Sequence, residues 1–242
     1  MTLNPQLIRT DTAMTFEGFP KDLFKFLAEL AANNNREWFN ANKPRYEQSV
    51  VEPVIEFISE FDERLNNISE NFIADTRCNG GSMFRIYSDT RFSRDERPYK
   101  ENVGCHFRHV AGKDAHAPGF YLHLQPGNVF VGGGIWLPPG SALDSIRTAI
   151  VENPDSWKKI VNNKKFLKRF DEIQDDRLKR PPRGYDPDHE LLHDLKLKSF
   201  FIKRSLSDPN AQLPKFIDDV NRIYTEAAPL MKFLTNSVGL PF

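Results

Sequence analysis

The chain has 242 residues, in which 33 lysine and arginine residues balance 33 aspartate and glutamate residues, and it contains only two cysteines. A zero net charge provides no bulk positive field of the kind that drives non-specific binding to nucleic acid. Two cysteines without metal-type spacing indicate a reducing compartment, and no stretch approaches the roughly 20 apolar residues of a membrane span, so a cytoplasmic protein is expected.

The first third of the chain predicts helices. Apolar residues repeat at helical spacing after Pro20, which suits a first helical turn, until three asparagines at 33–35 end the pattern. A short helix carrying Trp38 is expected next. A longer helix is then expected to open at Pro44 and to bend at Pro53.

The hydrophobic period changes to two after Cys78. Strands are predicted around residues 84–87, 103–108, 120–124 and 128–136, where apolar and polar side chains alternate. The short turn at 125–128 favours antiparallel pairing over parallel units joined by helices. Three glycines at 132–134 lack the spacing of a phosphate-binding loop or a dinucleotide site, so no cofactor is expected, and they indicate a bulge or a close backbone approach.

A helical pattern returns after Pro139, with Ser141 as the expected N-cap, and a basic, turn-rich stretch then runs to Asp188. Two further helices are predicted at 191–204 and 214–234. Helices, then strands, then helices predict an α+β fold, with a central antiparallel β-sheet of four or more strands flanked by N-terminal and C-terminal helices. Without a linker or repeat, one domain is expected over residues 16–242 after an N-terminal tail of residues 1–15.

The polar positions of the predicted strands are rich in hydrogen-bond donors. If neighbouring strands pair in register, these side chains share one face and suit a small anionic ligand that bears a phosphate or carboxylate. His106 and His123 are the candidate acid/base groups. The alternative is a solvated outer face of the sheet. The side chains at these positions are Arg85, Tyr87, His106, Arg108, Tyr121 and His123.

Two basic loops extend this hypothesis. The first supplies Asp89, Arg91, Tyr99 and Lys100, which could surround an anion beside Arg85, or could form an ion-pair network that pins the loop. The second is stiffened by two prolines and carries Arg180, Arg183 and Tyr185. It predicts either a cationic lid over the sheet face or a surface turn.

The segment from His189 to His193 matches the pattern H-E-x-x-H. On a helix this spacing places two imidazoles one turn apart as zinc ligands, with Glu190 as the base of a hydrolase. No histidine follows His193, so a third ligand would have to be a distant carboxylate. A zinc-dependent hydrolase is therefore a second alternative, and no metal is expected under the leading hypothesis.

Three motifs in order resemble the uncharacterised family called domain of unknown function 2461, over about residues 16–233. The resemblance implies a conserved hypothetical protein, found in bacteria and fungi, without an established activity. Where the family usually has arginine and lysine, this chain has Ser88 and Glu96, which removes positive charge from the first loop. The motifs are Asn33-Asn34 with Arg36-Glu37-Trp38-Phe39 and Tyr46, then Arg85, Asp89-Thr90-Arg91-Phe92, Pro98-Tyr99-Lys100 and Gly104, and then Leu178-Lys179-Arg180 with Arg183-Gly184-Tyr185.

The leading hypothesis is therefore a small anionic ligand on the polar sheet face. The first alternative is a module that binds nucleic acid or protein through the basic loops, with Tyr87, Tyr99 or Tyr121 stacking on bases. Zero net charge makes nucleic acid the less favoured partner. Whether the protein is an enzyme, and its oligomeric state, stay open at this point.

Overall fold

The computed structural model describes residues 16–89, 97–112, 117–170, 173 and 176–242. It confirms the α+β class: five antiparallel strands lie in the order β1-β2-β3-β4-β5, with helices before and after them. The N-terminal tail predicted over residues 1–15 lies outside the described residues. The strands are β1 (Phe72–Ile73), β2 (Val103–His109), β3 (Gly119–Leu124), β4 (Val129–Ile135) and β5 (Phe200–Leu206).

The N-terminal helices are α1 (Lys21–Ala32), α2 (Arg36–Tyr46), the π-helical turn η1 (Glu47–Val51) and α3 (Glu52–Ile68). The predicted helix start at Pro44 was wrong, because Asn35 already caps α2: its side chain accepts from the Trp38 N–H at 2.9 Å. Pro53 stands in the first turn of α3. Pro53 lacks an N–H, and the π-helical turn η1 directly precedes the helix that contains it.

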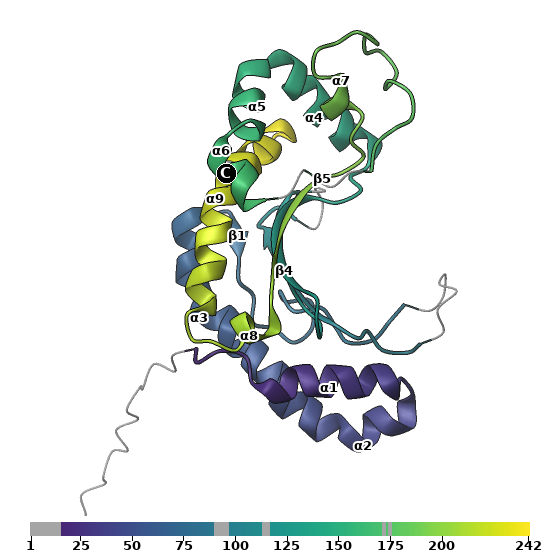
Figure 1. The fold of residues 1–242 in the computed structure, drawn as a ribbon, viewed down its shortest axis with the longest axis vertical. Coiled ribbons are helices and arrows are strands. Elements are labelled where there is room, and N and C mark those ends of the chain that lie inside the picture. Colours follow the sequence, from purple (N-terminus) through teal and green to yellow (C-terminus); the bar gives the residue numbers. More distant parts are fainter. Residues whose placement is uncertain (1–15, 90–96, 113–116, 171–172, 174–175) are drawn as a thin grey trace, which may run out of the picture.

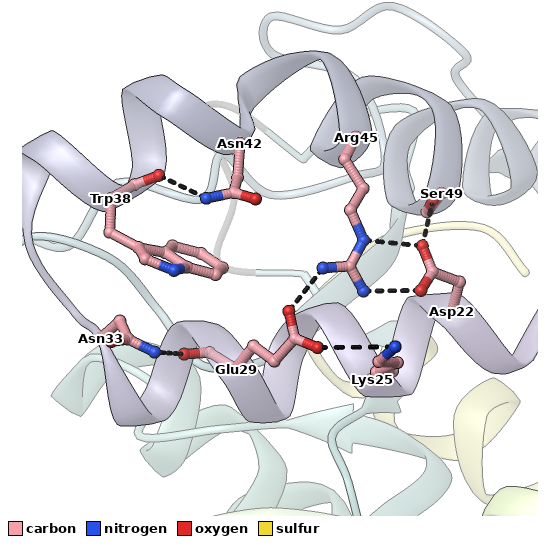
Figure 2. Close-up of polar contacts among 8 residues, drawn as sticks. All are labelled: Asp22, Lys25, Glu29, Asn33, Trp38, Asn42, Arg45 and Ser49. Atoms are coloured by element: carbon pink, nitrogen blue, oxygen red, sulfur yellow. Dashed lines mark hydrogen bonds and ion pairs between the residues drawn. The ribbon is translucent and has the colours of Figure 1, made fainter.

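An ion-pair cluster ties α1 to the following helices (Figure 2). The Arg45 guanidinium donates from Nη2 to Asp22 Oδ1 at 2.6 Å and from Nε to Oδ2 at 2.9 Å, and it also pairs with Glu29. Ser49 Oγ donates to Asp22 Oδ2 at 2.7 Å. The hydrogen bonds from Arg45 lower the pKa of Asp22 to about 2, against the opposing effect of its partial burial. The cluster therefore stabilises the contact between α1 and the π-helical turn.

The strand predicted at 84–87 was wrong, because this segment changes partners midway. The Phe84 N–H donates to Gly104 O at 2.8 Å, whereas the Lys100 N–H donates to Ile86 O at 2.7 Å. Only isolated bridges result, Met83 with Cys105 and Tyr87 with Tyr99. The ladder is interrupted between them, and the short strand β1 pairs with the far end of β2 instead.

The helix predicted over 191–204 was also wrong. Only α7 (Leu192–Leu195) is helical there, and β5 begins at Phe200. Phe200 and Ile202 are fully buried while Phe201 and Lys203 are half-buried, which is the period of a strand. The helical spacing of the first half of this window concealed that change of period.

The helix predicted over 214–234 is confirmed as the core of α9 (Phe216–Ser237). Before it come α4 (Gly140–Glu152), α5 (Pro154–Val161), α6 (Lys164–Arg169) and α8 (Asp208–Ala211). Pro139, not the predicted Ser141, stands at the N-cap of α4. Helices α5 and α6 lie in the basic stretch for which turns were predicted.

Helices α3 and α9 cover one face of the sheet, and no described helix lies over the other face (Figure 1). Tyr224 of α9 stacks on Phe120 of β3 with ring centroids 4.6 Å apart, so the core lies between α9 and the sheet. The uncovered face therefore remains available to a ligand. None of the described helices combines the length and the hydropathy that crossing a membrane requires.

Candidate functional site

The uncovered face carries alternate residues of four strands. The register places His106 opposite Tyr121, Tyr121 opposite Gly132, and Gly132 opposite Lys203, so these residues form one row across the sheet. Arg108 and His123 lie in the neighbouring rows of the same face, because they are two residues from His106 and Tyr121 in their strands. The structure thus brings together four predicted residues, His106, Arg108, Tyr121 and His123.

Rings cover this face and form what we call the aromatic floor: Phe84, His106, Tyr121, Phe130, Trp136 and Phe201. Centroids of neighbouring rings lie about 6 Å apart: 6.0 Å for Phe84 and His106, 5.9 Å for Tyr121 and Phe130, and 6.1 Å for Trp136 and Phe201. A cavity of about 540 Å³ opens above the floor. Its remaining lining is Ala117, Gly119, Gly134, Ile135, Pro138 and Lys203.

Glycines allow three of these rings, those of His106, Tyr121 and Phe201, to lie close against the strands. A Cβ on Gly119 would stand 2.1 Å from His106 Nε2, and a Cβ on Gly104 would stand 2.5 Å from Tyr121 Oη. At Gly132 a Cβ would meet Ile202 O at 2.2 Å and the Phe201 ring at 2.7 Å. The close backbone approach predicted for the three glycines at 132–134 is therefore present, between β4 and β5.

His106 is a half-buried imidazole at the edge of the aromatic floor. Burial, with a smaller contribution from the charge of Arg108, lowers its pKa to about 4. Its ring makes no hydrogen bond to a described residue. At neutral pH it is uncharged, so one ring nitrogen can donate a hydrogen bond to a ligand while the other accepts.

His123 is held by its neighbours and does not line the cavity. Its Nε2 lies 3.2 Å from Gln125 Oε1, and because a carbonyl oxygen only accepts, Nε2 carries the proton. Nδ1 then accepts from the Tyr121 hydroxyl at 3.3 Å. Burial lowers the pKa of His123, which stacks on Phe130 at 4.6 Å. In this geometry His123 orients Tyr121.

Three cations surround the aromatic floor. Lys203 lines the cavity, with its ammonium 5.7 Å from the centroid of the Phe130 ring. Lys100 and Arg108 lie 5.5 Å and 6.0 Å from the centroid of Phe84. No carboxylate of a described residue forms an ion pair with Lys203 or Arg108. The face is therefore apolar at its centre and positive at its rim.

Several residues predicted around the first loop do not reach the cavity. Tyr99 is 4% exposed and stacks on Phe39 at 4.1 Å, so it belongs to the core. Lys100 Nζ donates to the carbonyl oxygen of Arg85 at 3.0 Å, and the exposed Arg85 side chain is not part of the lining. Asp89 is exposed as well, and Arg91 lies outside the described residues.

The second basic loop lies between α6 and α7. Its base is closed by the Leu178 N–H, which donates to Lys196 O at 2.7 Å. Arg180 and Arg183 are exposed and Tyr185 packs against the core, and none of the three lines the cavity. The geometry is that of the surface turn, which was the alternative to a lid.

The H-E-x-x-H segment does not have the helical geometry of a zinc site. His189 precedes α7, and its Nδ1 accepts the Leu191 N–H at 3.0 Å. Glu190 pairs with Lys158 at 2.7 Å. Within the described part of the chain, no group of three histidine, cysteine, aspartate or glutamate side chains could hold a metal ion.

Four residues of the lining were not among the predicted site residues: Phe130, Trp136, Phe201 and Lys203. Phe130 and Trp136 lie in and just after a correctly predicted strand, so their alternation with buried neighbours could have identified them. Phe201 and Lys203 were missed because β5 was taken for a helix. Leu137, which follows Trp136, has a φ of 44°, and its N–H donates to the buried Ser199 hydroxyl at 2.9 Å.

Comparison with known proteins gives one match. The family model described as conserved hypothetical protein (DUF2461) matches residues 22–233, most of the chain. No curated protein and no solved structure matches it.

Proposed function

We infer that this chain, which belongs to the conserved hypothetical protein family DUF2461, binds a small molecule composed of a flat ring and an anionic group on the open face of its sheet. The observation that carries the proposal is the aromatic floor. Six rings line a cavity of about 540 Å³, and glycines let three of them, those of His106, Tyr121 and Phe201, lie close against the strands. Ligand sites are typically about 300–1,000 Å³, mostly apolar, with a few placed polar groups.

The rings favour a flat ligand body. Aromatic side chains prefer offset or edge-to-face contacts with centroids about 4.5–7 Å apart, and a ring lying on the floor can make several such contacts at once. Phe201 and Phe130 supply the middle of the surface, and Trp136, which is 60% exposed, stands at its mouth. A saturated or very polar ligand would lose this contribution.

The charges favour one anionic group rather than a polyphosphate. Only two of the three cations, Lys100 and Arg108, lie beside the same ring, that of Phe84, and Lys203 stands apart over Phe130, whereas a polyphosphate needs several cations around one point. His106, uncharged and without a hydrogen-bond partner among the described residues, can orient the ligand. With a pKa of about 4 it is a weak base at neutral pH, so binding is the part of the hypothesis that the geometry supports.

Calorimetric titration with 2-naphthyl phosphate, and with inorganic phosphate as the ring-free control, tests the proposal. We expect the naphthyl compound to bind at least tenfold more tightly. Phe201→Ala should weaken its binding about fivefold or more, because the variant removes a stacking partner worth about 1 kcal/mol. Leu167→Ala, an equally apolar truncation on exposed α6, should leave the affinity unchanged. Equal affinity for the two compounds would contradict the proposal.

A further inference from the structure

A second cavity adjoins the aromatic floor at His106. It has a volume of about 290 Å³, and His106 lines both cavities. Its other polar side chains come from the segment after β1 and from the end of β2, namely Asp75, Arg77, Ser82, Arg108 and His109. The His106 ring therefore separates the second cavity from the place where the ring of the proposed ligand would lie.

Arg108 supplies the uncompensated charge of this second cavity. Arg77 and Asp75 neutralise each other, since Arg77 Nε lies 2.9 Å from Asp75 Oδ2 and the hydrogen bonds from Arg77 lower the pKa of that carboxyl. Arg108 is half-buried and makes no hydrogen bond or ion pair with a described residue. Its guanidinium lies 6.0 Å from the centroid of the Phe84 ring, and its charge acts on Asp75 and His106. Its guanidinium has five N–H donors in a fixed fork, and a half-buried fork without acceptors suits an incoming oxyanion.

We propose that the Arg108 cavity is the oxyanion subsite of the ligand and that the ligand class is a ring-bearing phosphate monoester. The inference rests on the proposed function, because the ring must lie on the aromatic floor for its phosphate to pass His106. A phosphate group offers three terminal oxygens, enough for a bidentate contact with Arg108 and for one further hydrogen bond from the neutral His106 ring.

Lys203 is the competing cation, and the register separates it from Arg108. Lys203 is on β5 and Arg108 is on β2, three strands apart, which at the usual strand spacing is about 14 Å. The Lys203 ammonium lies over the Phe130 ring, and the Arg108 guanidinium lies beside the Phe84 ring. Lys203 lines the larger cavity, whereas Arg108 lines the second cavity, so a phosphate in the second cavity meets Arg108.

The test compares 2-naphthyl phosphate with 2-naphthol, which has the same ring without the phosphate. In the wild-type chain the phosphate should bind at least tenfold more tightly. Arg108→Gln should abolish that advantage and leave the affinity for naphthol unchanged, which also shows that the variant is folded. Lys203→Gln, the matched loss of one positive charge on the same face, should preserve the advantage.

The outcomes separate the two proposals. If naphthol binds but the phosphate gives no advantage, or if the advantage survives Arg108→Gln and disappears in Lys203→Gln, the Arg108 subsite is wrong while the aromatic site stands. If neither compound binds, the proposed function itself fails, and the subsite fails with it.

Discussion

The close approach of aromatic rings to the strands depends on glycine, whose side chain is a single hydrogen atom. At Gly132 a Cβ would meet both a backbone oxygen of β5 and the Phe201 ring. A backbone oxygen cannot rotate away as a side chain can. The β4–β5 pairing and the position of Phe201 therefore both require glycine at position 132.

We expect Gly132→Ala to lower the free energy of unfolding by about 1–3 kcal/mol, the usual cost of overpacking a tight interior. Gly140→Ala is the matched control: a Cβ at Gly140, the first residue of α4, meets nothing within 4 Å. Urea denaturation measures both variants. Equal stabilities of the two would mean that β4 and β5 are not in such close contact.

The pKa of His106 gives a second test at this scale. Because burial lowers it to about 4 in the folded chain, the unfolded chain takes up the proton first as the pH falls. The contribution of the uncharged His106 ring to the free energy of unfolding is complete above about pH 6.5 and is lost progressively as the pH falls toward 4. Between pH 7.5 and pH 5 the wild type should lose up to about 2 kcal/mol more stability than His106→Gln.

Proton NMR titration of the histidine ring measures the same quantity directly. A folded-state pKa near 6.5 for His106 would show that the ring is solvated and that the aromatic floor does not bury it. In that case the difference between the wild type and His106→Gln would vanish as well.

Residue patterns anticipated part of the site. The alternation in β2 and β3 was sufficient to place His106, Arg108, Tyr121 and His123 on one face, since strand period decides the side on which a side chain lies. Arginine-rich composition was misleading: Arg85, Arg180 and Arg183 are exposed and line no part of the cavity. Composition shows that a loop is charged, but the approach of distant segments decides what the loop faces.

At the scale of elements, the Arg45 cluster explains how the helices that begin the chain are held together. Arg45→Met should lower the free energy of unfolding by about 1 kcal/mol, because partly exposed ion pairs contribute modestly. The side chains of Arg45, Asp22 and Glu29 are 27%, 40% and 37% exposed. Lys25→Met, which removes a 3.9 Å pair with Glu29 at a 71% exposed lysine, should cost clearly less.

The acid dependence of this cluster has a defined sign. The pKa of Asp22 is lowered to about 2. The contribution of its carboxylate to the free energy of unfolding is therefore present above about pH 4 and is lost as the pH falls toward 2. In Arg45→Met the pKa of Asp22 should return to its ordinary value of about 3.9, which carboxyl NMR can follow. An unchanged pKa in the variant would show that Arg45 does not hold this carboxylate in solution.

Element boundaries were predictable where local signals acted alone. The helix that ends at the asparagine run and the strands β2 to β4 follow from their own periods. The strand β5 did not, because a helical period in 191–198 runs directly into an alternating one at Phe200. The segment 82–88 did not either, because its hydrogen bonds depend on a bend in its partner strand, which no local pattern records.

At the scale of the whole molecule, the order of helices and strands was sufficient to predict the α+β class. In such a fold the helices pack on one face of the antiparallel sheet, so the other face is exposed. The open face and its polar positions followed from that. What did not follow is its aromatic character, since Phe130 and Trp136 come from one segment and Phe201 from another, and the pairing of β4 with β5 brings them together.

Amide chemical-shift mapping with 2-naphthyl phosphate tests the central claim, that the open sheet face binds a ring-bearing anion. We predict that the largest shifts fall on residues 119–123, 130–136 and 201–203, with a second group at Arg108 and residues 80–82. Shifts confined to the loop at 178–185, or no saturable shifts on the sheet, would contradict the claim.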